Sequence, residues 1–288
     1  MIDARAIVSP EAQLAPDVSV GPFSIIGPQV QIGPRTVIGP HVVVNGPTTI
    51  GADNRIFQFA SIGDAPQDKK YRGEPTQLVI GDRNIFRESC TINRGTTHDK
   101  GVTRIGDDNL FMAYAHVAHD CLIGNNTVFA NSVAMGGHVE VGDWAILGGL
   151  VAVHQFAKIG AHAFLGGGAI LSRDVPPYVM VAGNPAVPHG VNVEGLRRRG
   201  FTDEQIRHIR EAYRVLYRSE MKLSEALAQL APLAQERAEI RAFVDFIRSS
   251  TRSLVRGVRW TRGRPRRRRR CASASWRVSI REISSARR

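Results

Sequence analysis

A large hydrophobic residue recurs at every sixth position along most of the chain between Val8 and Leu171. The series runs from Val8 to Ile62 (10 positions), from Ile80 to Ile92 (3) and from Ile105 to Leu171 (12), and all 25 positions hold Ile, Val, Leu, Phe or Met. A period of six matches neither an α-helix, at 3.6 residues, nor a simple strand, at 2. It fits a short strand and a turn repeated as a solenoid. The repeat therefore predicts a mainly β fold in which each unit forms one side of a coil.

Two other slots of the repeat support this fold. The residue after the aliphatic is Gly in 14 of the 25 units, where it either relieves backbone crowding or supplies a positive φ at a corner. The residue two before the aliphatic is usually small or β-branched, as at Val18 and Ser24, and we expect it to pack inside with the aliphatic. Three sides make a triangular 18-residue coil, and stacked coils lie about 4.8 Å apart, the spacing of hydrogen-bonded strands.

Two polar segments interrupt the repeat and are predicted as loops at 64–79 and 94–102. The interval from Ile62 to Ile80 equals three units, so the repeat resumes in phase, whereas that from Ile92 to Ile105 exceeds two units by one position. Long loops on a rigid scaffold are either functional or surface excursions. The spacing leaves both interpretations open.

A Pro/Gly-rich segment after Leu171 ends the repeat, and helical patterning follows. We therefore predict a β-helix domain at 1–189 and a small helical domain at 190–256. Thr202 is the predicted N-cap of one helix, and Ser224 is predicted to open a further helical stretch that ends near Ile247.

The net charge of +12 is concentrated at the C-terminal end of the sequence. Residues 257–288 hold 12 Arg and one Glu, which gives +11, so residues 1–256 carry only +1. Composition predicts disorder for this tail. It is interpreted as a nucleic-acid-binding arm, an anionic-membrane contact or an out-of-frame translation of GC-rich DNA. The third is favoured, because nothing else in the chain calls for a nucleic acid, and no nucleic-acid partner is predicted.

The chain has three cysteines, Cys90, Cys121 and Cys271, and no CxxC motif. Their number and spacing predict no disulfide framework. They indicate a reducing compartment. The N-terminus lacks a basic region followed by an apolar core, and no apolar stretch has the length of a membrane span. We therefore expect a cytoplasmic protein without stable membrane insertion.

The 18-residue coil predicts which side chains share an edge, because positions one full coil apart stack. One predicted column holds His119, Gly137, Gln155 and Arg173, and the adjacent column holds Asp120, His138 and Phe156. His119 and His138 are therefore predicted neighbours. Together with His116 and His154 they form a predicted cluster of four histidines.

An imidazole beside a carboxylate is the usual apparatus for removing a proton from a hydroxyl at neutral pH, and Asp120 adjoins His119. An isolated histidine is more often a solvated turn residue. Clustered histidines can also bind zinc, as in the hexapeptide-repeat carbonic anhydrases. The spacings of 3, 19 and 16 match no zinc pattern, and Gln155 and Arg173 supply donors for an anionic substrate. We therefore favour acid–base chemistry without metal and keep a zinc-dependent hydratase as the alternative.

A column of small residues is predicted on a different edge: Ala113, Asn131, Gly149 and Gly167. An extended acyl chain could lie along such an unobstructed groove. Small residues also fit tight corners or allow subunits to pack, and the sequence leaves these interpretations open.

Five ordered motifs carry a resemblance to a known family: HVAHDC (116–121), GGHV (136–139), AVHQF (152–156), VPPYV and GVNVEGLRRRGF (190–201), together with the loop QDKKYRGEP. The chain resembles the UDP-N-acetylglucosamine O-acyltransferases of lipid A biosynthesis from residue 1 to about 256. The resemblance implies a left-handed parallel β-helix followed by a small helical domain. It further implies a homotrimer that transfers a 3-hydroxyacyl group from the phosphopantetheine thioester of acyl carrier protein to the 3-hydroxyl of UDP-N-acetylglucosamine. This is the first step of lipid A biosynthesis, and it needs no cofactor. Another CoA- or ACP-dependent hexapeptide-repeat acyltransferase, acting on a different nucleotide sugar, stays open as an alternative beside the zinc-dependent hydratase.

The same resemblance implies roles for individual residues. His119 is the general base, Asp120 orients it, and the backbone N–H of Gly137 holds the oxyanion. Positions implied to line the substrates are His116, His138, His154, Gln155, Asn192, Glu194 and Arg198, with Asp68 and Lys70 supplied by a neighbouring subunit and Gly167 limiting acyl length. A basic helix face is implied to bind acyl carrier protein: Arg197, Arg199, Arg207, Arg210, Arg214 and Arg218.

Overall fold

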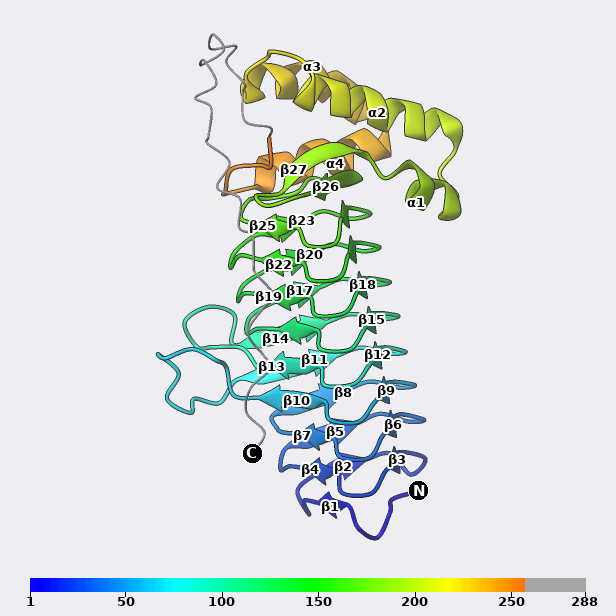
Figure 1. The fold of residues 1–288 in the computed structure, drawn as a ribbon, viewed down its shortest axis with the longest axis vertical. Helices are drawn as coiled ribbons and strands as arrows, with labels where there is room; N and C mark the ends of the chain where they lie inside the picture. The colour runs from blue at the N-terminus through cyan, green and yellow to red at the C-terminus, as the bar shows by residue number, and fades with distance from the viewer. Residues whose placement is uncertain (257–288) are drawn as a thin grey trace, which may run out of the picture. The chain divides into compact units, whose positions relative to one another are not determined.

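The computed structural model describes residues 1–256, which belong to one compact unit. Short strands form coils that stack along one axis, and the strands on each of the three sides of the stack pair into a sheet (Figure 1). Four helices lie at the C-terminal end of this unit (Figure 1). The predicted β-helix is confirmed. The Arg-rich segment 257–288 lies outside the described residues.

Each sheet forms one side of the coil, and the chain visits them in the order B, C, A. Sheet B contains β1 (Ile7–Val8), β4 (Ile25–Ile26), β7 (Val43–Val44), β10 (Ser61–Asp64), β13 (Thr91–Asn93), β16 (His116–Val117), β19 (Ala134–Met135), β22 (Ala152–Val153) and β25 (Ile170–Leu171). Sheet C contains β2 (Gln13–Leu14), β5 (Val30–Ile32), β8 (Thr48–Ile50), β11 (Gln77–Ile80), β14 (Val102–Ile105), β17 (Leu122–Ile123), β20 (Glu140–Val141) and β23 (Lys158–Ile159). Sheet A contains β3 (Ser19–Val20), β6 (Val37–Ile38), β9 (Arg55–Ile56), β12 (Ile85–Phe86), β15 (Leu110–Phe111), β18 (Val128–Phe129), β21 (Ile146–Leu147), β24 (Phe164–Leu165), β26 (Val179–Ala182) and β27 (Val187–Val191). The turns between consecutive strands are named below as the B–C, C–A and A–B corners.

Strand register confirms the 18-residue coil. Ile7 pairs with Ile25, and Val117 pairs with Met135. The six-residue aliphatics fill the interior, where Phe86, Phe111 and Phe129 stack with ring centroids 4.8 and 4.7 Å apart. The small slot is also inside, since Val18 and Ser24 are buried.

The glycine slot relieves crowding between coils. A Cβ on Gly21 would lie 2.7 Å from the carbonyl carbon of Gly39 in the next coil. The positive φ at this corner belongs instead to Phe23, at 61°. Backbone crowding therefore explains the glycine here, and the corner turns through a non-glycine residue.

The two loops are insertions at one corner. Ile62 pairs with Ile92 and Ile50 with Ile80, an offset of 30, whereas Ile80 pairs with Ile105, an offset of 25. Because an uninterrupted coil gives an offset of 18, the interval from Ile62 to Ile80 is one side plus an insertion of twelve, and the second loop inserts seven. Both leave the B–C corner in successive coils and lie side by side (Figure 1). They span 65–76 and 94–101, shorter than predicted, because their ends pair into β10, β11 and β14.

A hairpin and four helices follow the coils. β26 pairs in parallel with β24 and antiparallel with β27. The helices are α1 (Val193–Arg198), α2 (Asp203–Tyr217), α3 (Leu223–Glu236) and α4 (Ala238–Ser249). The predicted boundary between 189 and 190 falls inside β27, and the division into two domains stays a prediction.

The helix starts show one success and one error of sequence reasoning. Thr202 is the N-cap of α2, and its Oγ1 accepts from the Gln205 N–H at 3.2 Å. Ser224 does not cap α3; Lys222 does, with its own N–H bonded to Glu225 Oε2 at 2.8 Å. The stretch also divides into two helices at Arg237, whose backbone is extended. In residues 1–256, no helix has the length and apolar character needed to cross a membrane.

Candidate active site

A cleft of about 690 Å³ lies at the B–C corner, beneath both loops. It receives side chains from the first loop, the second loop and three successive corners. Its lining residues are Gln67, Asp68, Lys69, Lys70, Thr96, His98, Asp99, His119, His138, Gln155 and Phe156. The two predicted neighbours His119 and His138 and residues of both loops thus line one cleft.

His119 and Asp120 form a hydrogen-bonded pair at this corner, with 2.9 Å between Nδ1 and Oδ2. The His119 side chain is 12% exposed and that of Asp120 is fully buried. Asp120 occupies the left-handed corner position, with φ at 59°. Its carboxylate points inward while the adjacent His119 reaches the cleft.

Thr96, from the second loop, occupies the rest of the Asp120 carboxylate. Its N–H lies 3.0 Å from each carboxylate oxygen and its Oγ1 donates to Oδ2 at 2.6 Å. Burial raises the pKa of Asp120, but the hydrogen bonds from His119 and Thr96 outweigh it, so the pKa lies below its ordinary value. An ionised carboxylate accepts only, so His119 Nδ1 carries the proton of this bond, and Nε2 is the ring nitrogen that faces away from the carboxylate.

Gly137 lies directly against the His119 ring. A Cβ at this position would be 2.5 Å from His119 Cε1 and 2.7 Å from Nε2. Any side chain at Gly137 would therefore displace the imidazole. The backbone of Gly137 borders the same ring nitrogen that faces away from the carboxylate.

His138 lies one coil from His119, with ring centroids 4.8 Å apart and planes nearly perpendicular. The backbone N–H of His138 donates to the backbone carbonyl of His119 at 2.9 Å. The ring stacks flat on Phe156, 4.3 Å between centroids, and its Nδ1 is 2.6 Å from Asp99 Oδ2. His119 and His138 are therefore neighbours, as predicted. Asp99, which contacts His138, belongs to neither predicted column.

Two more histidines belong to the same region. His116, in β16, has its Nδ1 2.7 Å from Thr91 Oγ1, and its pKa lies below the ordinary value, chiefly because the ring is buried. His154 is exposed, with its Nδ1 3.0 Å from the Gln155 carbonyl oxygen. Gln155 itself lines the cleft.

Asp68 and Lys70 line the cleft from the first loop of the same chain. The Lys70 N–H donates to Asp68 Oδ1 at 3.0 Å, which lowers the pKa of Asp68. The resemblance implies that a neighbouring subunit supplies these residues. In this chain they already reach their own B–C corner, because the loop starts there.

Gly167 lies at the A–B corner, separated from the cleft by the face of sheet B. The small column is present, since Leu150 N–H donates to the Asn131 carbonyl and Gly168 N–H to the Gly149 carbonyl. A Cβ on Gly167 would approach only the backbone of Gly149, with the carbonyl oxygen at 3.3 Å. Side-chain room therefore exists along this column.

The predicted nucleotide residues lie elsewhere in the chain, on and before α1. Asn192 is the buried N-cap of α1, accepting from Gly195 N–H at 3.2 Å and donating to the His162 carbonyl at 3.0 Å. Glu194 and Arg198 are exposed and 3.3 Å apart. His162 belongs to the C–A corner, so one chain does not bring this set to the histidine cleft.

The arginines implied to bind a protein partner are mostly exposed. The exposed members are Arg197 before α2, three arginines on α2 and one at its C-cap: Arg207, Arg210, Arg214 and Arg218. Arg199 differs, because it is half-buried with its guanidinium over the Trp144 ring at 5.0 Å.

The sequence reasoning missed five residues of the cleft, and two of them, Thr96 and Asp99, contact the site's carboxylate and histidine directly; the others are Gln67, Lys69 and His98. Thr96 and Asp99 both belong to the second loop, and each supports one of the paired histidines. The repeat gave no signal for them, because a residue in an insertion has no register in the coil.

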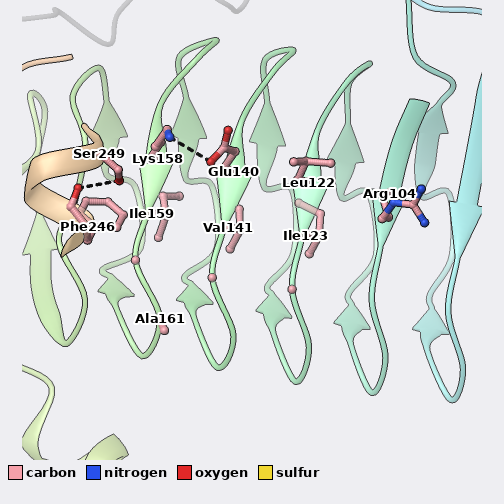
Figure 2. Close-up of a pocket in the computed structure, with 13 residues that line it drawn as sticks. Arg104, Leu122, Ile123, Glu140, Val141, Lys158, Ile159, Ala161, Phe246 and Ser249 are labelled. Carbon is pink, nitrogen blue, oxygen red and sulfur yellow. Dashed lines mark hydrogen bonds and ion pairs between the residues drawn. The ribbon is translucent and has the colours of Figure 1, made fainter. Parts of the chain in front are cut away.

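A second hollow, of about 400 Å³, lies on the outer face of sheet C beside α4. Figure 2 shows Arg104, Leu122, Glu140 and Lys158 in a row across this face, with Phe246 and Ser249 at one end. Glu140 and Lys158 pair with each other at 3.2 Å. This hollow has an apolar floor and none of the histidines, so the cleft at the B–C corner is the candidate site.

Three groups of the cleft are close enough to share a metal ion: one ligand atom each from His119, Asp120 and His138 lies within 4.8 Å of the others. The Nδ1 atoms of both histidines face carboxylates, and Asp120 is already bonded to Thr96. These contacts use Nδ1 of each histidine and leave Nε2 of each ring without a carboxylate partner, and Nε2 is a common zinc ligand. The geometry therefore favours hydrogen-bonded acid–base chemistry but keeps the zinc-dependent hydratase as the alternative.

The chain is similar to known proteins over most of its length. Residues 11–46 and 103–137 match the bacterial transferase hexapeptide family, and 174–255 match the second domain of the UDP-N-acetylglucosamine O-acyltransferase family. A protein from Thiobacillus denitrificans named acyl-(acyl-carrier-protein)–UDP-N-acetylglucosamine O-acyltransferase is 54% identical over 255 residues, covering 88% of this chain and 99% of the relative. One of the same name from Verminephrobacter eiseniae is 56% identical over 257 residues, covering 89% and 98%.

Solved structures give the same result. The UDP-N-acetylglucosamine acyltransferase of Francisella novicida superposes with a TM-score of 0.88 at 44% identity, covering 90% of this chain and 95% of that one. The enzyme from Moraxella catarrhalis gives 0.87 at 46% identity, covering 88% and 99%.

The fold and the site define a hexapeptide-repeat acyltransferase with a left-handed parallel β-helix. The identity with curated relatives, over nearly their full length, narrows the class. This chain belongs to the UDP-N-acetylglucosamine O-acyltransferase family, which acts in lipid A biosynthesis.

Proposed function

We propose that the chain transfers a 3-hydroxyacyl group from the phosphopantetheine thioester of acyl carrier protein to the 3-hydroxyl of UDP-N-acetylglucosamine, with His119 as general base. The observation that carries the mechanism is the His119–Asp120 pair, in which a buried carboxylate is bonded to Nδ1 and Nε2 faces away from it beside Gly137. This is the arrangement that removes a proton from a hydroxyl at neutral pH.

The reaction is an acyl transfer through a tetrahedral intermediate. His119 Nε2 takes the proton of the sugar hydroxyl while its oxygen attacks the thioester carbonyl. The backbone N–H of Gly137 donates to the resulting oxyanion. Collapse of the intermediate breaks the carbon–sulfur bond, and the departing thiolate receives the proton from His119. The atoms balance without a metal or a cofactor, so none is proposed.

Residues of the cleft, together with His116 and His154, are proposed to hold the two substrates. Asp68, Lys70, His116 and His138 surround the reacting groups, while His154 and Gln155 line the path of the pantetheine. The acyl chain is proposed to cross sheet B toward Gly167, where the small column leaves room. Docking of the acidic carrier protein is assigned to the exposed arginine face of α2, because complementary charge favours encounter.

A homotrimer is proposed on the arrangement of the predicted residues. Asn192, Glu194 and Arg198 lie beside the C–A corner, whereas the histidine cleft is at the B–C corner. A single nucleotide sugar reaches both sets only when two copies of the chain supply them. A cytoplasmic location is proposed because Cys90 and Cys121 are free thiols, as is usual for proteins of a reducing compartment.

The test is an assay of the purified full chain with UDP-N-acetylglucosamine and a ladder of 3-hydroxyacyl carrier proteins. Formation of the 3-O-acyl sugar nucleotide is expected, with one chain length preferred. Substitution of other nucleotide sugars is the control, and faster transfer to one of them would replace the acceptor named here.

The zinc-hydratase alternative is tested by metal analysis of the same preparation. We expect activity to survive chelation and bound zinc to be far below one ion per chain. Stoichiometric zinc, together with CO₂ hydration, would support the hydratase instead.

A further inference from the structure

The second loop supports the histidine–carboxylate pairs of both neighbouring histidines. Thr96 and Asp99 both belong to it, and while Thr96 bonds Asp120 behind His119, Asp99 bonds His138 directly. The His138 Nδ1 to Asp99 Oδ2 distance is 2.6 Å, shorter than the 2.9 Å in the His119–Asp120 pair. The cleft thus contains two histidine–carboxylate pairs side by side.

The surroundings of His138 leave its ring little freedom. One face of the ring stacks on Phe156 with 7° between the planes, and His119 meets it edge-on. Its side chain is 12% exposed. Packing therefore fixes the plane of the ring. A rotation of the ring by 180° about Cβ–Cγ keeps that plane, so packing alone does not prevent it.

Asp99 removes that remaining freedom. Burial raises the pKa of Asp99, but His138 and Lys100 outweigh it and keep the carboxyl below its usual range, so it is ionised at neutral pH. An ionised carboxylate accepts only. A short bond to Nδ1 therefore requires a proton on that nitrogen and leaves Nε2 for the substrate.

We propose that Asp99 is a positioning residue of the acyl-transfer site, which holds His138 with Nδ1 protonated and Nε2 available to a substrate hydroxyl. The expected effect of Asp99 on turnover rests on the proposed function. The position and tautomer of His138 are claims about the chain itself.

The main competing explanation is that Asp99 only ties down its loop. Asp99 also pairs with Lys100, whose Nζ lies 3.2 Å from the same Oδ2 atom. Lys100→Gln removes this pair and keeps the contact with His138, which makes it the matched control. Activity of Lys100→Gln within about twofold of the parent is expected.

The kinetic test is a double-mutant cycle on the full chain. Asp99→Asn keeps the size of the side chain but adds an N–H donor, so the amide no longer dictates which ring nitrogen holds the proton. A loss of about tenfold in kcat/KM is expected from the lost charged hydrogen bond. In a His138→Ala background the same substitution is expected to change kcat/KM by less than about twofold, since contacting residues are not additive. An equal loss in both backgrounds, or no loss in the parent background, would overturn the proposal.

A second readout needs no turnover. In ¹⁵N-histidine-labelled protein, with His138 assigned by its loss in the His138→Ala variant, the ring is expected to show a protonated Nδ1 in the parent and a mixture of tautomers in Asp99→Asn. Identical spectra would sink the proposal. A parent chain that shows the expected tautomer but no acyl transfer would refute the proposed function while leaving the position of His138 established.

Discussion

The B–C and A–B corners are built from the same six-residue unit but differ in chemistry. Asp120, His138 and Phe156 occupy the left-handed position of successive B–C corners, with φ at 59°, 63° and 65°. The corresponding A–B positions hold Tyr114, Ser132 and Leu150, at 64°, 60° and 61°. The backbone is therefore the same at both corners. Side chains and the two inserted loops make one of them a site and leave the other an exposed edge.

Stacked aromatic rings occur at both corners, which makes the contrast sharper. At the A–B corner His41 stacks between Phe23 and Phe59, with centroids 5.1 and 5.5 Å away. At the B–C corner His138 stacks on Phe156 but also contacts His119 and Asp99. The histidines of the B–C corner have carboxylate partners, Asp120 from the corner itself and Asp99 from the second loop.

The largest expected effect separates two histidines. His119→Ala should lower acyl transfer by about 10²–10⁴-fold, the usual cost of a lost general base, without unfolding the chain. His41→Ala, its counterpart on the A–B edge, should retain activity within about twofold, because it removes only surface stacking. Steady-state assays with circular dichroism check both. Near-normal turnover of His119→Ala would refute its role.

The next effect concerns the glycine beside the base. Gly137→Ala places a methyl group 2.5 Å from His119 Cε1, so the ring must move. A displacement of this size should cost about 10²-fold in kcat, with little loss of stability because the ring can swing into the cleft. Gly27→Ala is the control, since its Cβ would meet backbone no closer than 3.3 Å. Equal activities of the two variants would show that Gly137 does not constrain the base.

A smaller, selective effect is expected along the small-residue column. Gly167→Met should extend into the groove, since a Cβ there meets only the Gly149 backbone. Transfer of long 3-hydroxyacyl chains should fall by about tenfold relative to short ones, as even one methylene in a hydrophobic pocket is worth about 1–3 kcal/mol. The donor ladder measures the ratio. An unchanged preference would place the acyl chain elsewhere.

The smallest expected effect is on acid stability. The pKa of Asp120 is lower in the folded chain than in the unfolded chain, so its stabilisation is present above the ordinary carboxyl range and is lost as pH falls through the folded value. Between about pH 5 and pH 2, the urea midpoint of Asp120→Asn should therefore fall less than that of the parent. Asp53→Asn, which removes an exposed partner of Arg35, should change this pH dependence less. Parallel curves for Asp120→Asn and the parent would contradict the buried ionised carboxylate.

Much of the scaffold could be predicted because the repeat is strict. The period of six required a solenoid, and the 18-residue coil correctly placed His138 beside His119 and Gly137 against the same ring. Thr202 was identified as a helix cap because its pattern is local. The predicted start at Ser224 is one residue late, since α3 begins at Leu223 with Lys222 as its N-cap, and local preference does not decide between neighbouring starts.

The loops could not be placed from spacing. An interval of three repeat units fits three sides of a coil, and it fits equally one side with an insertion of two units' length. Only the pairing of Ile62 with Ile92 and of Ile80 with Ile50 distinguishes them. Thr96 and Asp99 were missed for this reason, since a residue in an insertion has no register.

The sequence by itself determined the coil, its core and the column of histidines, because side chains at a fixed period must stack when the coils do. Tertiary structure alone decided that both insertions leave the same corner and that Asp99 in the second insertion reaches His138. Periodicity specifies what repeats. The loop contacts that complete this site join residues that are distant in the sequence, and a repeat does not specify such contacts.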